Sequence, residues 1–264
     1  MELELYHVDA FTSRVFSGNP ACVVLLDNWL SDDILLAMAR EHAVAETAYL
    51  LHMGAGRYRL RWFTPDLEMD LCGHATLASG HVIFNHVEPD LGEVQFETIS
   101  GTLTVSRLPQ GGYAMILPKR APSPAILPDE IEAALNTAPV EVLKARDFML
   151  VYRQEDDIRS LQVNRQIFDR INLGTGGVIV TAPGDEVDFV SRFFTPQATI
   201  LEDPVTGSAH CTSAPFWAEK LGKTQLKARQ LSQRGGELNC EILREEVRIS
   251  GHAVTYSTSR ILLP

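Results

Sequence analysis

Two short segments that begin with glycine carry side chains suited to proton chemistry. One is Gly73-His74, and the other is Gly207-Ser208, which follows Asp203. Each glycine opens an apolar stretch typical of a buried helix, so the free N–H groups of two helix N-termini would be available to a carboxylate. Histidine and aspartate are suited to acid/base catalysis. We therefore predict that the two glycines and Ser208 bind a small carboxylic acid, with His74 and Asp203 assisting its reaction.

Glu46 stands in an otherwise apolar segment, residues 43–50, which is predicted to be a strand. If that segment is buried, desolvation should raise the pKa of Glu46 and suit it to exchange a proton near neutral pH. A solvent-facing glutamate on the strand is the alternative. His74 and Ser208 also have structural alternatives, because either side chain could cap a helix or pair within the core.

Cys72 precedes the first glycine, where a helix dipole could lower the pKa of its thiol. The other three cysteines, Cys22, Cys211 and Cys240, have the spacing of neither a zinc site nor a disulfide framework. Nucleotide-binding loops and metal-ligand motifs are absent from the sequence. We therefore expect proton chemistry with no cofactor and no metal.

The elements that must position these residues occur twice. The segment Arg61–Pro65 returns as Arg192–Pro196, 131 residues later, and each copy is followed by one of the glycine turns. Helices are predicted from Gly73 to about Asn85 and from Gly207 to Leu221, the second bent or started late by Pro215. Two copies of one α+β unit that face each other would leave a cleft for a small ligand.

Composition limits the class of protein. The 264 residues are 45% hydrophobic and 22% charged, with a formal net charge of −11. Nucleic acid and membrane surfaces are therefore not expected partners, and a cytoplasmic location is expected because no secretory signal is present. The proline-rich stretch 118–128 predicts a boundary between domains 1–117 and 118–264, while the final strand could return to the first domain.

The chain resembles the PhzF-like family, named for the phenazine-biosynthesis isomerase, whose fold is that of diaminopimelate epimerase. The matching segments span nearly the whole chain in the expected order. They are Val8–Phe11 with Phe16–Pro20, Ala45–Ala48, Phe63–Pro65 with Cys72–Thr76, Glu202–His210, and Gln230–Gly236.

The resemblance implies two pseudo-symmetric domains, each a curved, mostly antiparallel sheet around a central helix, with the site in the interdomain cleft. It also implies a cofactor-independent isomerase, expected as a homodimer. Glu46 matches the family's general acid/base. The residues that match its substrate-contacting positions are Asn19, Gly73, His74, Asp203, Gly207 and Ser208.

Two alternatives stay open beside this hypothesis. Cys72 matches one cysteine of the epimerase pair, but Thr206 stands where the repeat would place the second. A racemase that uses Cys72 as one base is therefore a rival, and a non-catalytic member that binds a ligand or a partner is another. The sequence identifies neither the natural substrate nor its pathway.

Overall fold

The computed structural model describes residues 1–263, and the chain divides into two compact units. Unit 1 comprises residues 1–116 with 250–264, of which Pro264 lies outside the described residues, and unit 2 comprises residues 117–249. The boundaries fall within strands β8 (Tyr113–Pro118) and β17 (Glu246–Gly251). The sequence left open where the final strand belongs. In the structure it belongs to unit 1, because β18 (Ala253–Leu262) pairs antiparallel with β1 (Glu2–Ala10) along its length.

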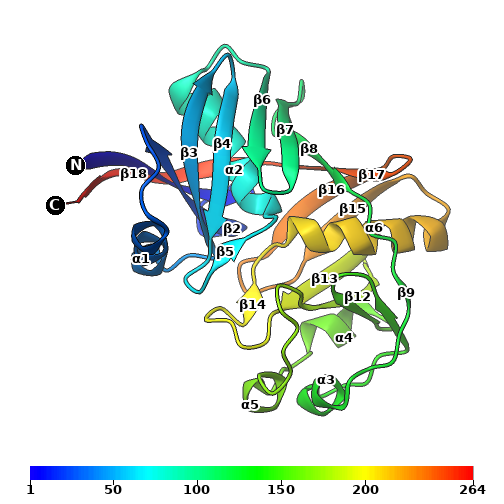
Figure 1. Cartoon of the computed structure of the whole chain (residues 1–264). Coiled ribbons are helices and arrows are strands. Elements are labelled where there is room, and N and C mark those ends of the chain that lie inside the picture. The colour runs from blue at the N-terminus through cyan, green and yellow to red at the C-terminus, as the bar shows by residue number, and fades with distance from the viewer. Residues whose placement is uncertain (264) are drawn as a thin grey trace. The chain divides into compact units, whose positions relative to one another are not determined.

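Unit 1 is a mixed sheet that surrounds one helix (Figure 1). Its remaining elements are β2 (Asn19–Leu26), α1 (Asp32–His42), β3 (Glu46–Gly54), β4 (Arg57–Phe63), β5 (Glu68–Met69), α2 (Gly73–Val82), η1 (Ile83–Val87), β6 (Glu93–Thr98) and β7 (Gly101–Arg107). The strands run in the order β18-β1-β2-β3-β4-β6-β7-β8. The β2–β3 and β4–β6 pairs are parallel and the others antiparallel.

Helix α2 is the centre of unit 1. All ten of its residues are buried, and it packs against β1, β2, β3, β7 and β18. Gly80 allows the close approach of β7, since a Cβ there would lie 2.7 Å from Cγ1 of Val105. The helix was predicted to run to about Asn85. In the structure the α-helix ends at Val82 and continues as the π-helical turn η1 to Val87, so the extent of the helical segment is confirmed and only its last turn is of a different type.

Unit 2 repeats this arrangement. Its elements are β9 (Ser123–Pro124), α3 (Asp129–Ala134), β10 (Glu141–Lys144), β11 (Phe148–Val151), α4 (Glu155–Arg159), α5 (Arg165–Phe168), β12 (Val178–Pro183), β13 (Phe189–Phe194), β14 (Glu202–Asp203), α6 (Gly207–Leu221), β15 (Gln225–Gln230) and β16 (Gly236–Ile242). The order β10-β11-β12-β13-β15-β16 alternates antiparallel and parallel pairs as β1-β2-β3-β4-β6-β7 does. Helix α6 packs against β12, β15 and β16.

An ion pair at matched positions shows the repeat in side chains as well. Arg61 on β4 donates to Glu68 on β5, and Arg192 on β13 donates to Glu202 on β14, both with an Nε–Oε1 distance of 2.7 Å. The predicted α+β fold with two pseudo-symmetric units is therefore confirmed. The stretch 118–128 was predicted only as a linker, but within it β9 pairs with β10. None of the helices within residues 1–263 is long and apolar enough to cross a membrane.

Candidate active site

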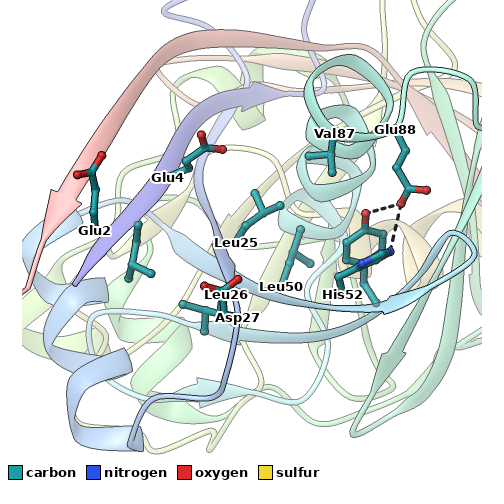
Figure 2. A pocket seen from close by; sticks show the side chains of 11 residues that line it. Glu2, Glu4, Leu25, Leu26, Asp27, Leu50, His52, Val87 and Glu88 are labelled. Atoms are coloured by element: carbon teal, nitrogen blue, oxygen red, sulfur yellow. Dashed lines mark hydrogen bonds and ion pairs between the residues drawn. The ribbon is translucent and has the colours of Figure 1, made fainter.

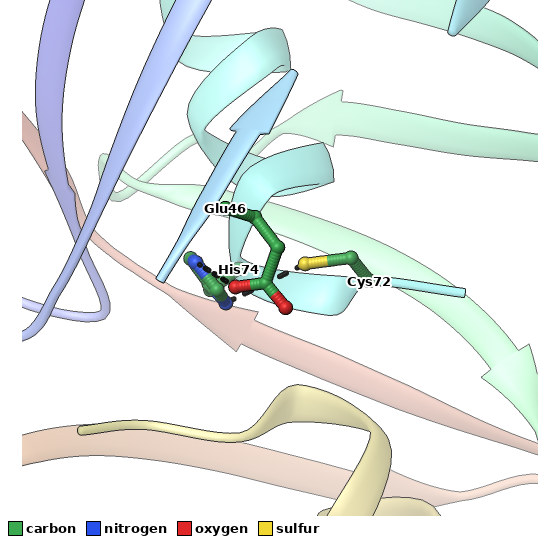
Figure 3. Close-up of side chains that lie close together, drawn as sticks. All are labelled: Glu46, Cys72 and His74. Atoms are coloured by element: carbon green, nitrogen blue, oxygen red, sulfur yellow. Dashed lines mark hydrogen bonds and ion pairs between the residues drawn. The ribbon is translucent and has the colours of Figure 1, made fainter. Parts of the chain in front are cut away.

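Three elements of unit 1 place four polar side chains together. Asn19 begins β2 and Glu46 begins β3, and these strands are parallel neighbours with Ala21 opposite Glu46. Parallel strands start at the same edge of a sheet, so both side chains lie at that edge. Helix α2 starts there too, with Cys72 at its N-cap and His74 in its first turn. Figure 3 shows the Glu46 carboxylate between the imidazole of His74 and the thiol of Cys72.

The two nitrogens of His74 have different neighbours. Its Nδ1 lies 3.0 Å from Nδ2 of Asn19 and 3.5 Å from Sγ of Cys72. A neutral ring carries one N–H group, and its hydrogen bond to the backbone of Pro20 uses that group, because proline offers only a carbonyl. Nε2 in turn lies 3.2 Å from Oε2 of Glu46. Nε2 therefore contacts the glutamate carboxylate at ion-pair distance but without hydrogen-bond geometry.

His74 is electrically neutral at ordinary pH. Its side chain is 3% exposed, and burial lowers its pKa to about 3, although a hydrogen bond to the backbone of Pro20 acts in the opposite direction. The contact with Glu46, whose side chain is 13% exposed, is therefore between a carboxylate and a neutral ring, not between opposite charges. A neutral imidazole of such low basicity can donate a hydrogen bond but is a poor proton acceptor.

Buried histidines should make the protein sensitive to mild acid. Burial lowers the pKa of His74 to about 3 and that of His81 and His210 to about 4, whereas histidine in an unfolded chain has a pKa of about 6.5. Below about pH 6.5 the unfolded state therefore binds more protons than the folded state. The contribution of these neutral histidines to stability is fully present above that pH and is lost as pH falls. At pH 5 each histidine should cost about 2 kcal/mol of unfolding free energy.

Urea unfolding at pH 7 and pH 5 measures this loss. His210→Gln should flatten the pH profile because it removes one buried imidazole, while His252→Gln, at an exposed position, should not. Equal unfolding free energies at the two pH values would contradict the neutral, buried state of these rings.

Glu46, Cys72 and His74 are also a set that could hold a metal ion. One ligand atom from each lies within 4.8 Å of the others. Thiolate, imidazole and carboxylate ligands together suit Zn²⁺. A metal on Nδ1 of His74 would have to replace the Asn19 amide as its partner. The absence of a metal from the reaction remains a prediction of the sequence.

The other predicted residues lie in unit 2, at the start of α6. The Oδ2 atom of Asp203 accepts a hydrogen bond of 2.5 Å from the hydroxyl of Thr206, the N-cap residue. Gly207 begins the helix, and Ser208 in its first turn lies within 3.2 Å of Nη2 of Arg146. The structure thus groups Asp203, Gly207 and Ser208 in one unit, and Glu46, His74, Asn19 and Gly73 in the other.

Two residues that contact this turn from elsewhere in unit 2, Gln230 and Arg146, were given no role by the sequence analysis. Gln230 accepts the backbone N–H of Thr206 at 2.8 Å and donates to the carbonyl of Asp203 at 2.7 Å, so one buried amide holds the turn at both ends. Arg146 precedes β11 and belongs to no motif. The matching segment Gln230–Gly236 was a signal for Gln230, whereas no pattern pointed to Arg146.

Sheet register shows which residues of the two units correspond. Thr47 lies opposite Phe63, and Val178 lies opposite Phe194, so Thr47 corresponds to Val178. Glu46, the residue before Thr47, therefore corresponds to Gly177. A Cβ at Gly177 would lie 2.4 Å from Cζ of Phe193, which leaves no room there for a glutamate. Unit 2 therefore has no counterpart of the carboxylate at this position.

A pocket of unit 1 shown in Figure 2 differs in character from this site. It encloses about 360 Å³ and lies toward the other end of β3, with Leu50 in its wall. Its rim carries the carboxylates of Glu2, Glu4 and Glu88, and Glu88 accepts from the hydroxyl of Tyr58. Such a rim would repel an acidic ligand, so this pocket does not suit the predicted carboxylic acid.

Comparison with known proteins decides the family. The model of the phenazine biosynthesis-like protein family, PhzC-PhzF, matches residues 8–259. The chain belongs to this family. A relative named an uncharacterized isomerase, from Pseudomonas aeruginosa, is 46% identical over 264 residues, which is 100% of both chains.

Solved structures agree with this assignment. The PhzF-family phenazine biosynthesis protein of Enterococcus faecalis has a TM-score of 0.92 at 41% identity, over 100% of both chains. A probable proline racemase from Agrobacterium radiobacter has a TM-score of 0.66 at 12% identity and covers 99% of this chain and 93% of its own. At that identity the likeness to the racemase concerns the fold alone. The family and its epimerase-like fold are thus those that the sequence resembled.

Proposed function

We propose that the protein is a cofactor-independent isomerase that moves a proton on a small carboxylic acid, with Glu46 as the general acid/base. The observation that supports this proposal is the position of Glu46 at the N-terminus of α2, largely buried and beside the neutral imidazole of His74. General acid/base catalysis requires one group that takes up and returns a proton. His74, which is a poor base, lies against the carboxylate and positions it.

The proposed reaction moves one proton within one bound molecule. The Glu46 carboxylate removes a proton from a carbon next to an activating group, and the electrons of the broken C–H bond enter the conjugated system as an enolate. The protonated glutamic acid then returns the proton to a different carbon. Backbone N–H groups at Gly73, where α2 begins, favour negative charge on the ligand.

The residues of unit 2 are included in the proposal because of their sequence match to the family. Asp203, Gly207 and Ser208 match positions that surround the substrate in the family, and we propose that they bind and orient the same molecule. A homodimer and a cytoplasmic location remain predictions.

Exchange with heavy water tests the proposed reaction. The purified protein is incubated in D₂O with a panel of small unsaturated or β,γ-activated carboxylic acids, and deuterium in each acid is followed by NMR. The proposal expects incorporation into at least one acid at a carbon next to its activating group. A protein that binds acids of the panel but exchanges no proton in any of them would instead be a binding protein of this fold.

A cysteine-dependent racemase is the rival that one contact favours, since the thiol of Cys72 lies 3.5 Å from His74 Nδ1. Its second thiol is missing. Cys211, the nearest candidate in unit 2, is fully buried, and burial raises its pKa to about 12. We therefore expect Cys72→Ser to retain exchange within about tenfold, because a hydroxyl can either donate or accept and so can replace the thiol beside the ring.

Exchange rates of wild type and Cys72→Ser on the same acid decide between the two. Cys240→Ser is the matched control, since it removes another buried thiol. Loss of exchange in Cys72→Ser alone would support the racemase.

A further inference from the structure

The start of α2 brings together three different kinds of metal ligand: a thiol, an imidazole and a carboxylate. They belong to Cys72, His74 and Glu46, which converge in Figure 3, and one ligand atom of each lies within 4.8 Å of the other two. Cys72 and His74 are buried, whereas the side chain of Glu46 is 13% exposed, which leaves an approach for an ion. The proposed proton transfer uses Glu46 and His74 but gives the thiol no role.

His74 has the surroundings of a metal-binding histidine. Its Nε2 atom is buried and has no hydrogen-bond partner within residues 1–263, while the ring donates its N–H to the backbone carbonyl of Pro20. Histidines that bind a metal through one nitrogen usually donate the other N–H to such a carbonyl. Nε2 lies 3.2 Å from Oε2 of Glu46. Bonds of about 2.0 to 2.2 Å to tetrahedral zinc place nitrogen and oxygen ligands about 3.3 Å apart, so these two atoms already have the required separation.

Charge balance favours a divalent cation in this group. Cysteine binds metals as the thiolate, so Cys72 would release its thiol proton to solvent and carry one negative charge. The carboxylate of Glu46 supplies a second negative charge, and His74 is neutral. The three ligands together cancel the two charges of Zn²⁺, so the ion can be buried without an unbalanced charge. Thiolate and imidazole select zinc over magnesium and calcium, which prefer oxygen ligands.

The thiol has the largest distance to close. Ligand atoms around tetrahedral zinc lie about 3.3 to 3.6 Å apart, so the limit of 4.8 Å leaves up to roughly 1 Å for a rotation of the Cys72 side chain to supply. Cys72 is the N-cap residue of α2, and its side chain makes no capping hydrogen bond. The rotation therefore breaks none of the hydrogen bonds of the helix itself.

Unit 2 shows that the fold does not need these three side chains. Ser208 stands in α6 where His74 stands in α2, and the N-cap residue of α6 is Thr206, not a cysteine. Gly177 corresponds to Glu46 by sheet register. The same helix start thus forms in unit 2 without any of the three ligands, so their presence together in unit 1 is not a requirement of folding.

We propose that Glu46, Cys72 and His74 form a binding site for Zn²⁺, and that zinc bound there reversibly inhibits proton exchange by occupying the carboxylate of Glu46. Three protein ligands leave the fourth position of a tetrahedral ion to water. The proposed reaction itself uses no metal. Only the inhibition rests on the proposed function, because the binding of zinc depends on the three side chains alone.

Cobalt and zinc are the probes for binding. Co²⁺ enters tetrahedral zinc sites, and a thiolate bound to it gives a charge-transfer absorption band in the near ultraviolet. Wild type should show this band, and Zn²⁺ should displace the cobalt while Mg²⁺ should not. Cys72→Ser should abolish the band. It should also weaken zinc binding, measured by competition with a chromogenic chelator, at least about 100-fold, because loss of a ligand costs more than the about 10- to 100-fold loss typical of its outer partners. Cys240→Ser, which removes another buried thiol, should bind both ions as wild type does.

Inhibition is measured on the acid that wild type exchanges. Zn²⁺ should slow this exchange, and excess chelator should restore it. In Cys72→Ser, compared with its own rate without metal, the same inhibition should require at least about 100-fold more zinc. His52→Gln removes an exposed histidine that lies 3.6 Å from Glu88, and it should be inhibited as wild type is.

Absence of the cobalt band from wild type, or its persistence in Cys72→Ser, would overturn the metal site. Zinc that binds through Cys72 but leaves exchange unchanged would overturn the inhibition. Failure of the proposed function is separable from these outcomes. If wild type exchanges no proton but shows a band that depends on Cys72, the isomerase proposal fails and the metal site stands. If exchange is present and no band forms, the metal site fails alone.

Discussion

Replacing Glu46 by glutamine should slow proton exchange into the substrate by about 1,000-fold, within the range that general acid/base groups contribute. Glutamine has nearly the shape of glutamate, so it keeps the contact with His74 at this position. It cannot take up a proton. We therefore expect the exchange rate to collapse while the affinity for the acid stays within a few-fold of wild type.

Exchange by NMR in D₂O and binding by calorimetry, on the acid that wild type exchanges, separate the two effects. Glu41→Gln is the matched control, because Glu41 is an exposed glutamate of unit 1. Glu46→Asp should recover part of the rate, since it retains the carboxylate at a shorter reach. Exchange by Glu46→Gln within tenfold of wild type would transfer the role of base to another residue.

Gly18→Ala should lower the unfolding free energy by roughly 3 kcal/mol or more, a loss typical of strain at a constrained backbone position. Gly18 has φ +68°, a conformation that costs alanine about 1 kcal/mol. Its added Cβ would also lie 2.2 Å from the carbonyl oxygen of Ala10, so backbone must move. Ala10 pairs with Asn19, and the shift should also carry the Asn19 amide away from His74.

Gly54→Ala separates the two causes. Gly54 has φ +89°, and no heavy atom beyond its chain neighbours lies within 4 Å of the point that an added Cβ would occupy, so only the conformational cost of about 1 kcal/mol applies there. Urea unfolding measures both variants, and proton exchange should fall in Gly18→Ala but not in Gly54→Ala. Equal stability losses would contradict the close contact between Gly18 and Ala10.

Local pattern was enough to predict the helices at Gly73 and Gly207, because glycine at a turn followed by small apolar residues specifies a buried helix start. The repeated Arg-x-Phe-Thr-Pro segment, with Trp or Phe second, predicted two similar units, and strand register agrees with that pairing. The end of the first helix was predicted within its last turn. Its apolar sequence continues past Val82, and the change to a π-helical turn left no signal in the hydrophobic pattern.

The sequence by itself determined the repeated α+β architecture and the residue types of the candidate site, because both depend on patterns local in the chain. Only the tertiary structure decided that His74 is neutral and lies against Glu46, since its pKa depends on burial and its neighbours include Asn19, 55 residues away. The contact of Arg146 with Ser208, 62 residues apart, likewise arises from the packing of α6 on its sheet. Contacts of that range leave no spacing to read in a single sequence.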